Sequence, residues 1–329
     1  MGDDIFKIGE SEVAPGERKV INLPIARLYT NNWTHMPITV IRGEKDGPKL
    51  FICAAQHGDE INGVEIIRRV MDRKELSKIK GILIAVPVVN VFGFLNSSRY
   101  LPDRRDLNRS YPGSAKGSLA SRLAHLFLTE IAEKSTHGID IHTGAIHRYN
   151  LPQIRTSLDD EQTTEMAKAF GAPVILHSRQ RNNSLRETLA NEGTPIIVYE
   201  AGEALRYNES AIKLGVDGII RVMRHIGMLR KSRAKRTEPI QTRSSRWVRA
   251  KKSGLVQLKA KAGEKVTRHQ VIAVIADPLG ANMVNLKSPF DGVIIGHTNL
   301  PLVHAGDAVI NVAKAKISRE MQAELEQVT

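Results

Sequence analysis

Residues 50–60 read Leu-Phe-Ile-Cys-Ala-Ala-Gln-His-Gly-Asp-Glu, an apolar run followed by polar and small residues. The run is typical of a strand buried on both faces, and the apolar spacing over residues 61–70 is typical of a helix. His57 and Glu60 therefore lie at a predicted strand-to-helix junction, where open α/β sheets bind ligands. At this spacing an imidazole and a carboxylate can supply two ligands to one metal ion, although a capping or solvated-turn role is the alternative.

Apolar runs and helix-like segments alternate over the first 230 residues. The apolar runs cover residues 50–55, 82–89, 138–142, 173–177 and 195–200. The helix-like segments lie near residues 61–75, 118–134, 160–170, 184–191 and 208–229. This alternation predicts an α/β fold with a largely parallel sheet flanked by helices. Short β segments at 20–25 and 37–42 precede it within residues 1–45.

Polar residues end or directly follow four of these runs. They are His57, Asn90, His142 and Glu200. The carboxyl ends of parallel strands converge on one edge of a sheet. We therefore expect these side chains to meet in one crevice, although they are far apart in the sequence.

His57, Glu60 and His142 make up a His₂Glu set, which in catalytic sites binds one zinc ion and leaves a fourth position for water. Asp140 precedes His142 on the same strand face and can orient its imidazole or pair with an arginine. For His142 by itself, a core histidine is the alternative. Cys53, the single cysteine, falls in the first apolar run, which predicts a buried and inert thiol.

Metal-assisted hydrolysis also requires a base that is not itself a ligand. Glu200 is our candidate, because a glutamate that ends an apolar run must face the crevice or be paired. Glu203 is the rival, at the start of a looser segment.

Residues 99–109 carry four arginines around a proline. A guanidinium group is a preferred partner for a substrate carboxylate and can stabilise a developing oxyanion. The alternative is a solvated loop whose arginines pair with Asp103 and Asp106. We favour that alternative for Arg104 and Arg105.

Four motifs resemble those of the succinylglutamate desuccinylase/aspartoacylase family, which is related to the zinc carboxypeptidases. They occur in the family's order at residues 57–60, 106–109, 140–144 and 200–202, and the resemblance covers about residues 45 to 230. It implies a zinc-carboxypeptidase-like fold with a mixed, largely parallel sheet.

The resemblance also implies the roles of the catalytic residues. By it, His57, Glu60 and His142 bind one Zn²⁺ ion. Glu200 is the general base and later the proton donor, and Arg99 helps to polarise the scissile carbonyl group.

Three further residues contact the substrate by the same resemblance. Asn108 and Arg109 hold the carboxylate of the amino-acid part, and Arg155 is an additional contact. The implied activity is that of a zinc-dependent amidohydrolase that deacylates amino acids. Its candidate substrates are N-succinylglutamate, N-acetylaspartate and N-acetyl-diaminobutyrate. A zinc carboxypeptidase acting on small peptides is the second hypothesis, because zinc carboxypeptidases share this ligand set.

The net charge of +13 is concentrated in residues 230–252, which hold ten Lys or Arg and one acidic residue. Because this stretch also contains Pro, Ser and Thr and few aromatic residues, it is typical of a solvated basic linker. The third hypothesis, which we do not favour, is a nucleic-acid-binding protein that uses these basic residues.

From about residue 247 the sequence changes to short β-like segments with glycine turns. They form a weak internal repeat that resembles the hammerhead barrel of biotinyl and lipoyl domains. Such carriers need a lysine where this chain has Ala281, so we expect a scaffold that covers the active-site mouth or forms an oligomer contact. The predicted divisions are β segments 1–45, a hydrolase domain 46–230, a basic linker 231–246, a β-barrel-like domain 247–316 and a tail 317–329 with a short helix.

The chain lacks an apolar stretch of the ~20 residues needed to span a bilayer. Its first residues are acidic and no apolar signal segment follows them. We therefore expect a cytoplasmic protein without a membrane partner, with a small N-acyl amino acid as its ligand. The sequence leaves the oligomeric state open, with a homo-oligomer as one option.

Overall fold

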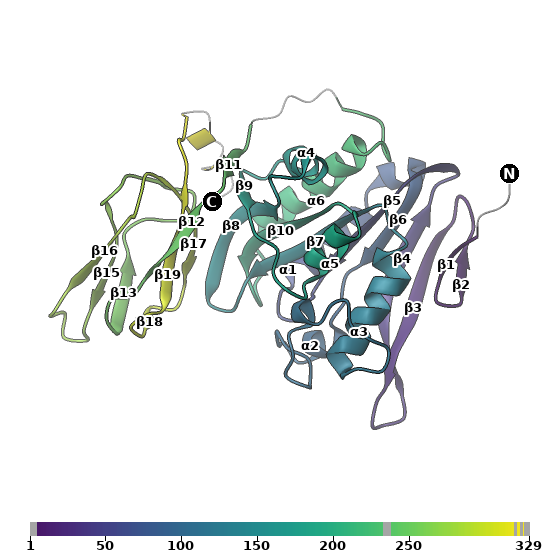
Figure 1. The fold of residues 1–329 in the computed structure, drawn as a ribbon, viewed down its shortest axis with the longest axis horizontal. Coiled ribbons are helices and arrows are strands. Elements are labelled where there is room, and N and C mark those ends of the chain that lie inside the picture. Colours follow the sequence, from purple (N-terminus) through teal and green to yellow (C-terminus); the bar gives the residue numbers. More distant parts are fainter. Residues whose placement is uncertain (1–4, 233–237, 319–320, 323–324, 326–329) are drawn as a thin grey trace.

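The computed structural model describes residues 5–232, 238–318, 321–322 and 325 of the chain. A large mixed sheet runs through the molecule, and helices cover both faces of its central part (Figure 1). The strands along the main path of this sheet are, in spatial order, β12 (Ser245–Arg249), β19 (Ala308–Lys314), β17 (Gly292–Thr298), β8 (Arg148–Thr156), β10 (Ile196–Glu203), β7 (His137–Gly144), β5 (Lys45–Ala54), β6 (Lys80–Val86), β4 (Trp33–Arg42) and β3 (Arg18–Arg27). The predicted α/β fold is confirmed.

The four strands β10, β7, β5 and β6 form a parallel core within this sheet. Alternate side chains of β5 enter different hydrophobic clusters. Leu50 and Ile52 pack in the cluster on one face, whereas Phe51 and Cys53 pack in the cluster on the other. Burial on both faces is the reason that the run is continuously apolar.

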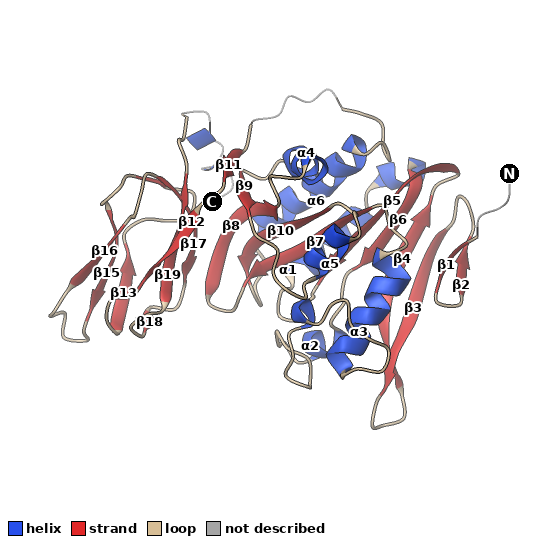
Figure 2. Cartoon of the chain, viewed as in Figure 1, coloured by secondary structure: helices blue, strands red, loops and turns tan. Residues whose placement is uncertain are grey.

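Helices cover the two faces of the parallel core as the alternating pattern predicts (Figure 2). Those contributing to the first cluster are α1 (Asn62–Met71), α4 (Glu161–Phe170) and α6 (Glu209–His225). Those contributing to the second are α2 (Val91–Leu95), α3 (Leu119–Phe127) and α5 (Leu185–Asn191). Shorter helical turns are η1 (Lys74–Lys78), η2 (Leu107–Arg109) and the π-helical η3 (Leu128–Ala132).

Strand β8 is a central element that the sequence pattern missed. It begins with polar residues and contains Pro152, which cannot donate a ladder hydrogen bond. In the sheet β8 runs antiparallel to β10 and β17 and parallel to β9 (Val174–His177). It therefore joins the parallel core to the C-terminal strands.

The N-terminal β segments form two hairpins. The predicted pieces at 20–25 and 37–42 lie within β3 and β4, which pair antiparallel, and β4 pairs with β6. A small separate hairpin consists of β1 (Phe6–Ile8) and β2 (Ser11–Val13).

The C-terminal region is rich in antiparallel strands, as expected. β12, β17 and β19 extend the large sheet, and β14 (Lys265–Val266) pairs with β17. A second sheet of four strands contains β13 (Gly254–Leu258), β15 (Val271–Ala276), β16 (Val284–Lys287) and β18 (Leu302–Val303). Apolar side chains from both sheets pack in a common cluster that includes Ala273, Ile275 and Val309.

The predicted basic linker, 231–246, contains ordered structure on its C-terminal side. β11 (Ile240–Thr242) pairs in parallel with β9, and β12 begins before the segment ends. Residues 233–237 lie outside the described residues, as does most of the predicted tail helix. Within the described parts of the chain, no helix is long and apolar enough to cross a membrane. The domain boundaries themselves stay a prediction.

Candidate metal centre and active site

The turn between β5 and α1 carries the first two candidate ligands and is tightly packed. Ala55 adopts a φ of +50°, which turns the chain away from β5. Gly58 lies so close to the backbone of α2 that a Cβ atom there would be 1.9 Å from the carbonyl carbon of Gly93. Glycine is therefore the residue that allows His57 and Glu60 to point back toward the sheet edge.

We expect Gly58→Ala to lower the free energy of unfolding by about 3 kcal/mol, because the added methyl group must displace backbone rather than a mobile side chain. Gly193→Ala is the matched control. Gly193 has open space around it, and only its φ of +78° is unfavourable for alanine, at a cost of about 1–2 kcal/mol. Urea unfolding of both variants measures the difference, and equal midpoints would contradict the close-packing argument.

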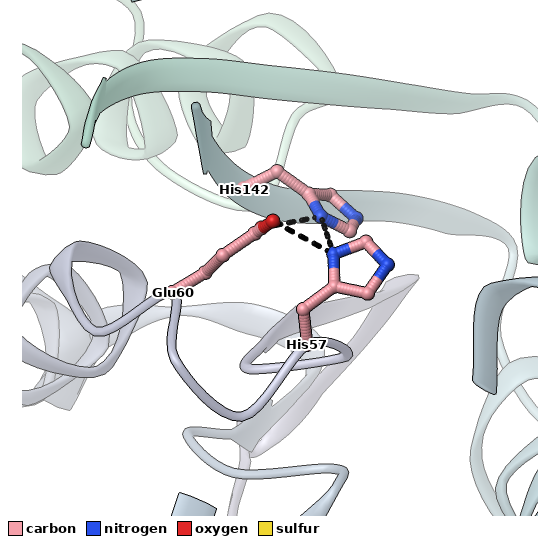
Figure 3. Close-up of side chains that lie close together, drawn as sticks. All are labelled: His57, Glu60 and His142. Carbon is pink, nitrogen blue, oxygen red and sulfur yellow. Dashed lines mark hydrogen bonds and ion pairs between the residues drawn. The ribbon is translucent and has the colours of Figure 1, made fainter. Parts of the chain in front are cut away.

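Three candidate ligands converge at the carboxyl ends of β5 and β7 (Figure 3). The Nδ1 atom of His57 lies 2.8 Å from one oxygen of Glu60, and the Nδ1 atom of His142 lies 2.8 Å from the other. The two Nδ1 atoms are 3.2 Å apart. The strands bring the ligands together because Ala54 pairs with Ile141 in the β5–β7 register. All three side chains are buried.

The donor set fits a zinc ion. Ligands of a tetrahedral zinc site at about 2.0–2.1 Å from the metal are about 3.3 Å apart, which is close to the separations of these three donors. The remaining nitrogen of each imidazole is held by a carboxylate: Nε2 of His57 lies 3.2 Å from Asp106 and Nε2 of His142 lies 2.8 Å from Asp140. Such pairing is characteristic of metal-binding histidines.

Charge stabilises the ionised form of Glu60. Burial alone would raise its pKa, but His57 and His142 hold the pKa of this carboxyl group well below its usual range. Conversely, burial alone would lower the pKa of His57. The charge of Glu60 and the hydrogen bond to Asp106 outweigh this effect and raise the pKa above its ordinary value. The site therefore favours positive charge beside Glu60, which a divalent ion would supply in place of protons on the ligands.

Asp140 contacts one of the candidate ligands, His142. It is buried, accepts a hydrogen bond from the imidazole of His142 and accepts another from the thiol of Cys53 at 3.3 Å. Of the two roles considered for Asp140, the structure therefore shows the contact with His142. The predicted burial of Cys53 is confirmed.

Asp140→Asn is expected to weaken zinc binding by roughly 10- to 100-fold, since an orienting carboxylate raises the basicity of the ligand and fixes its tautomer. A competition titration against a fluorescent chelator measures the affinity. Asp72→Asn is the control, because Asp72 is exposed and remote from the ligands. An affinity equal to that of the control would show that Asp140 does not act on His142.

Arg99 reaches the same centre from the segment between α2 and η2. Its Nη1 lies 3.3 Å from Glu60 and its Nη2 donates to Asp106 at 2.9 Å. Asp106 therefore pairs with Arg99 and His57 instead of belonging to a solvated loop. Asp103, in contrast, faces the exposed Arg105 at 3.8 Å, as the solvated-loop alternative predicts.

Asn108 and Arg109 line the cavity beside Arg99. The side-chain oxygen of Asn108 accepts a hydrogen bond from the backbone N–H of Leu185 at 3.0 Å, so it holds the start of α5. The guanidinium group of Arg109 donates to the main-chain oxygen of Asn108. The segment that carries these two residues thus also positions the loop before α5.

Glu200 lies opposite His142 in the β10–β7 register, so both side chains lie on the same face of the sheet. One of its carboxylate oxygens accepts from Asn150 at 2.6 Å, and the other pairs with Arg155 at 3.0 Å. Glu203 instead accepts from Asn299 at 2.6 Å and does not line the cavity.

One cavity of about 410 Å³ is lined by all eight predicted site residues. They are His57, Glu60, His142, Glu200, Arg99, Asn108, Arg109 and Arg155. Asn90, the fourth polar residue at a strand end, does not line it: Asn90 is buried and accepts from the N–H of Gly93 at 2.9 Å, where it caps α2. The expectation that it joins the crevice was wrong, because a helix begins directly after it.

The sequence reading missed several residues that line this cavity. Arg148 and Trp247 form a cation–π pair at 5.5 Å, and Arg181 and Arg186 come from the segment after β9. Their segment follows the carboxyl end of a predicted strand, but Arg181 lies four residues beyond it and Arg186 lies within α5, so neither residue directly follows the apolar run.

Comparisons with known proteins point to one family. The sequence model of the succinylglutamate desuccinylase/aspartoacylase catalytic domain matches residues 46–226. The N-alpha-acetyl-L-2,4-diaminobutyric acid deacetylase of Halomonas elongata is 27% identical over 294 residues, which are 85% of this chain and 85% of that protein.

Solved structures share the fold over most of the chain. A succinylglutamate desuccinylase/aspartoacylase from Rhodobacter sphaeroides has a TM-score of 0.80 and 25% identity, over 91% of this chain and 96% of its own. The product-bound structure of the ectoine utilization protein EutE (DoeB) from Ruegeria pomeroyi has a TM-score of 0.81 and 22% identity, over 91% of this chain and 94% of its own. At 22% identity, the similarity to this second structure shows a shared fold and nothing more.

Proposed function

Because the chain belongs to the succinylglutamate desuccinylase/aspartoacylase family, we propose that it is a zinc-dependent deacylase that hydrolyses the amide bond of an N-acylated amino acid. One observation carries the proposal. The donor atoms of His57, Glu60 and His142 lie within 4.8 Å of one another in a cavity that also contains Glu200 and a group of arginines. This arrangement combines a metal site, a base and anion-binding groups, which together are what amide hydrolysis of an amino-acid derivative requires.

His57, Glu60 and His142 would hold the zinc ion. When bound, the ion supplies positive charge that polarises a carbonyl group and makes a water molecule more acidic. Asp106 and Asp140 keep the imidazole rings oriented through their Nε2 atoms. The ligands are thus fixed before the substrate enters, which lowers the reorganisation needed during the reaction.

Glu200 acts as the general base. Its carboxylate accepts a proton from the attacking water, and the oxygen of that water forms the new bond to the carbonyl carbon. When the amide C–N bond breaks, Glu200 returns the proton to the leaving nitrogen. The products are a carboxylate and a free amino acid, so the atoms of one water molecule are accounted for. The contacts with Asn150 and Arg155 hold the carboxylate in the cavity during both transfers.

The arginine segment binds and polarises the substrate. Arg99 lies against Glu60 and stabilises negative charge that develops on the carbonyl oxygen. Asn108 and Arg109 hold the α-carboxylate of the amino-acid part. Arg155 pairs with Glu200, which supports a role in positioning the base more directly than a contact with the substrate.

Metal analysis followed by an amine-release screen tests the proposal. We expect about one zinc per chain, and release of a free amino acid from N-succinyl or N-acetyl amino acids that stops on chelation and returns when zinc is added. N-succinylglutamate, N-acetylaspartate and N-acetyl-diaminobutyrate form the first set of substrates. Faster hydrolysis of dipeptides than of every acyl amino acid would favour a carboxypeptidase. A purified protein that retains no metal and hydrolyses neither class would contradict the proposal.

A further inference from the structure

A buried cysteine contacts the carboxylate that holds one of the candidate metal ligands. Cys53 of β5 is paired with Asp140 of β7 in the strand register, and the two residues are 0% and 1% exposed. Since side chains two positions apart on a strand share a face, His142 projects from the same face as Asp140. The three residues therefore form a row that leads from the protein core to the ligand group.

Asp140 is held at both of its carboxylate oxygens. Oδ2 lies 2.8 Å from Nε2 of His142, and Oδ1 accepts from the thiol of Cys53 at 3.3 Å. Within the described parts of the chain, these are the two hydrogen-bond partners of the Asp140 side chain. The outer strand neighbours of the pair cannot replace the thiol, because Val86 beside Cys53 and Val198 beside Asp140 carry no polar side-chain atom.

The surroundings of Cys53 keep its thiol protonated. Burial and the negative charge of Asp140 raise the pKa of the thiol. A protonated thiol donates a hydrogen bond, whereas an ionised carboxylate only accepts. The hydrogen bond therefore runs in one direction, from the sulfur of Cys53 to Asp140.

Two further buried polar residues lie near Cys53. The hydroxyl of Tyr111 donates to Oε1 of Gln56 at 2.9 Å, which fixes the orientation of the amide group. Nε2 of Gln56 has no hydrogen-bond partner among the described residues, and Gln56 lowers the pKa of the Cys53 thiol, as a neighbouring donor does. The sulfur thus has a donor group on one side and the carboxylate of Asp140 on the other, which leaves its own hydrogen directed at the carboxylate.

We propose that Cys53 is a positioning residue of the metal centre: its S–H group holds Oδ1 of Asp140, so that Oδ2 keeps the imidazole of His142 in place for the metal. The inference rests on the zinc site of the proposed function and adds a residue that touches neither metal nor substrate. The thiol acts through its hydrogen bond and undergoes no reaction. The alternative is a small apolar side chain that only fills space, as buried cysteines often do.

Three substitutions separate the hydrogen bond from space filling. Cys53→Val and Cys53→Ala remove the donor, whereas Cys53→Ser keeps one in a smaller side chain. We expect zinc affinity, measured by competition with a fluorescent chelator, to fall roughly 5- to 10-fold in the first two variants and to stay within about threefold of wild type in Cys53→Ser. Unchanged affinity in Cys53→Val and Cys53→Ala, or weaker binding in Cys53→Ser than in Cys53→Val, would overturn the proposal.

Ile52→Val is the matched control for these variants. Ile52 is fully buried at the neighbouring position of β5 and packs in the cluster on the opposite face of the sheet. Trimming it disturbs the same strand without touching Asp140, so zinc affinity should equal that of wild type. Circular dichroism checks folding in each case. If either Cys53→Ala or Cys53→Val does not fold, the other still decides, because one opens space at the site and the other fills it.

A double-mutant cycle shows whether Cys53 acts through Asp140. In the Asp140→Asn background, Cys53→Val is expected to change zinc affinity by less than about twofold, because the carboxylate through which the thiol acts is absent. A packing effect would instead persist in both backgrounds. Losses that simply add would therefore show that Cys53 acts by filling space, and the proposal would be wrong.

Magnetic resonance of the metal-free protein separates this inference from the proposed function. With ¹⁵N-labelled histidine, the Nε2–H signal of His142 is identified by its absence from His142→Ala. We expect this signal to be protected from exchange with water in wild type and Cys53→Ser, and to broaden or vanish in Cys53→Ala. This result would support the role of Cys53 even if the protein hydrolysed no acyl amino acid or bound no zinc. Equal signals in all three proteins would contradict it.

Discussion

Glu200→Gln is expected to lower kcat by about 10³-fold or more while the zinc content stays at about one per chain. The introduced amide has nearly the same shape as the carboxylate but cannot accept the proton of the attacking water. Glu200 is not among the three convergent donor atoms, so the metal site does not depend on it. Steady-state kinetics and elemental analysis on the same protein sample measure the two quantities.

Glu203→Gln is the control for this result, because Glu203 lies on the same strand but is bound to Asn299. Its activity is expected to stay within about tenfold of wild type. Activity of Glu200→Gln within about tenfold of wild type would show that another group takes the proton. A large loss in Glu203→Gln with little loss in Glu200→Gln would transfer the role to Glu203.

His142→Ala is expected to abolish both zinc retention and activity. It removes one of three protein ligands, so the loss in zinc affinity should exceed the 10- to 100-fold that is typical for removal of an orienting partner. Thermal unfolding provides a second readout. Zinc at about 100 times its Kd stabilises a folded protein by about 2.7 kcal/mol, and this stabilisation should be present in wild type and absent in the variant.

His147→Ala is the matched control, because His147 lies five positions further along, is half exposed and is no member of the ligand group. It should retain zinc, thermal stabilisation and most of the activity. Stoichiometric zinc in dialysed His142→Ala, with wild-type affinity, would contradict the assignment of this ligand.

The sequence predicted that the candidate metal ligands come together, because their positions depend on a simple topological rule. In a parallel sheet the strand ends share one edge, so His57, His142 and Glu200 meet wherever their strands are neighbours. The β5–β7 and β7–β10 registers meet that condition. The same rule failed for Asn90, because a strand-end polar residue can also cap the helix that follows, and the two roles have the same sequence signature.

Other parts of the site depend on information that the pattern does not carry. β8 was missed because its polar start and its proline weaken the alternation by which strands are recognised. The partners of Glu200 on that strand, Asn150 and Arg155, were for this reason not connected to it. The gathering of six arginines at the cavity was also hidden, because they come from three separate segments of the chain: residues 99–109, strand β8 and residues 181–186.

The pairing of β8 with β17 makes the C-terminal strands part of the support of the candidate active site. Gly296 pairs with Asn150, the residue that donates to Glu200. A chain that ended before these strands would leave residues 148–150 of β8 unpaired on that side, and an open sheet edge is prone to pair with other molecules. The two regions should therefore unfold as one cooperative unit, and evolutionary exchange or loss of the C-terminal region is constrained by the need to keep that edge covered.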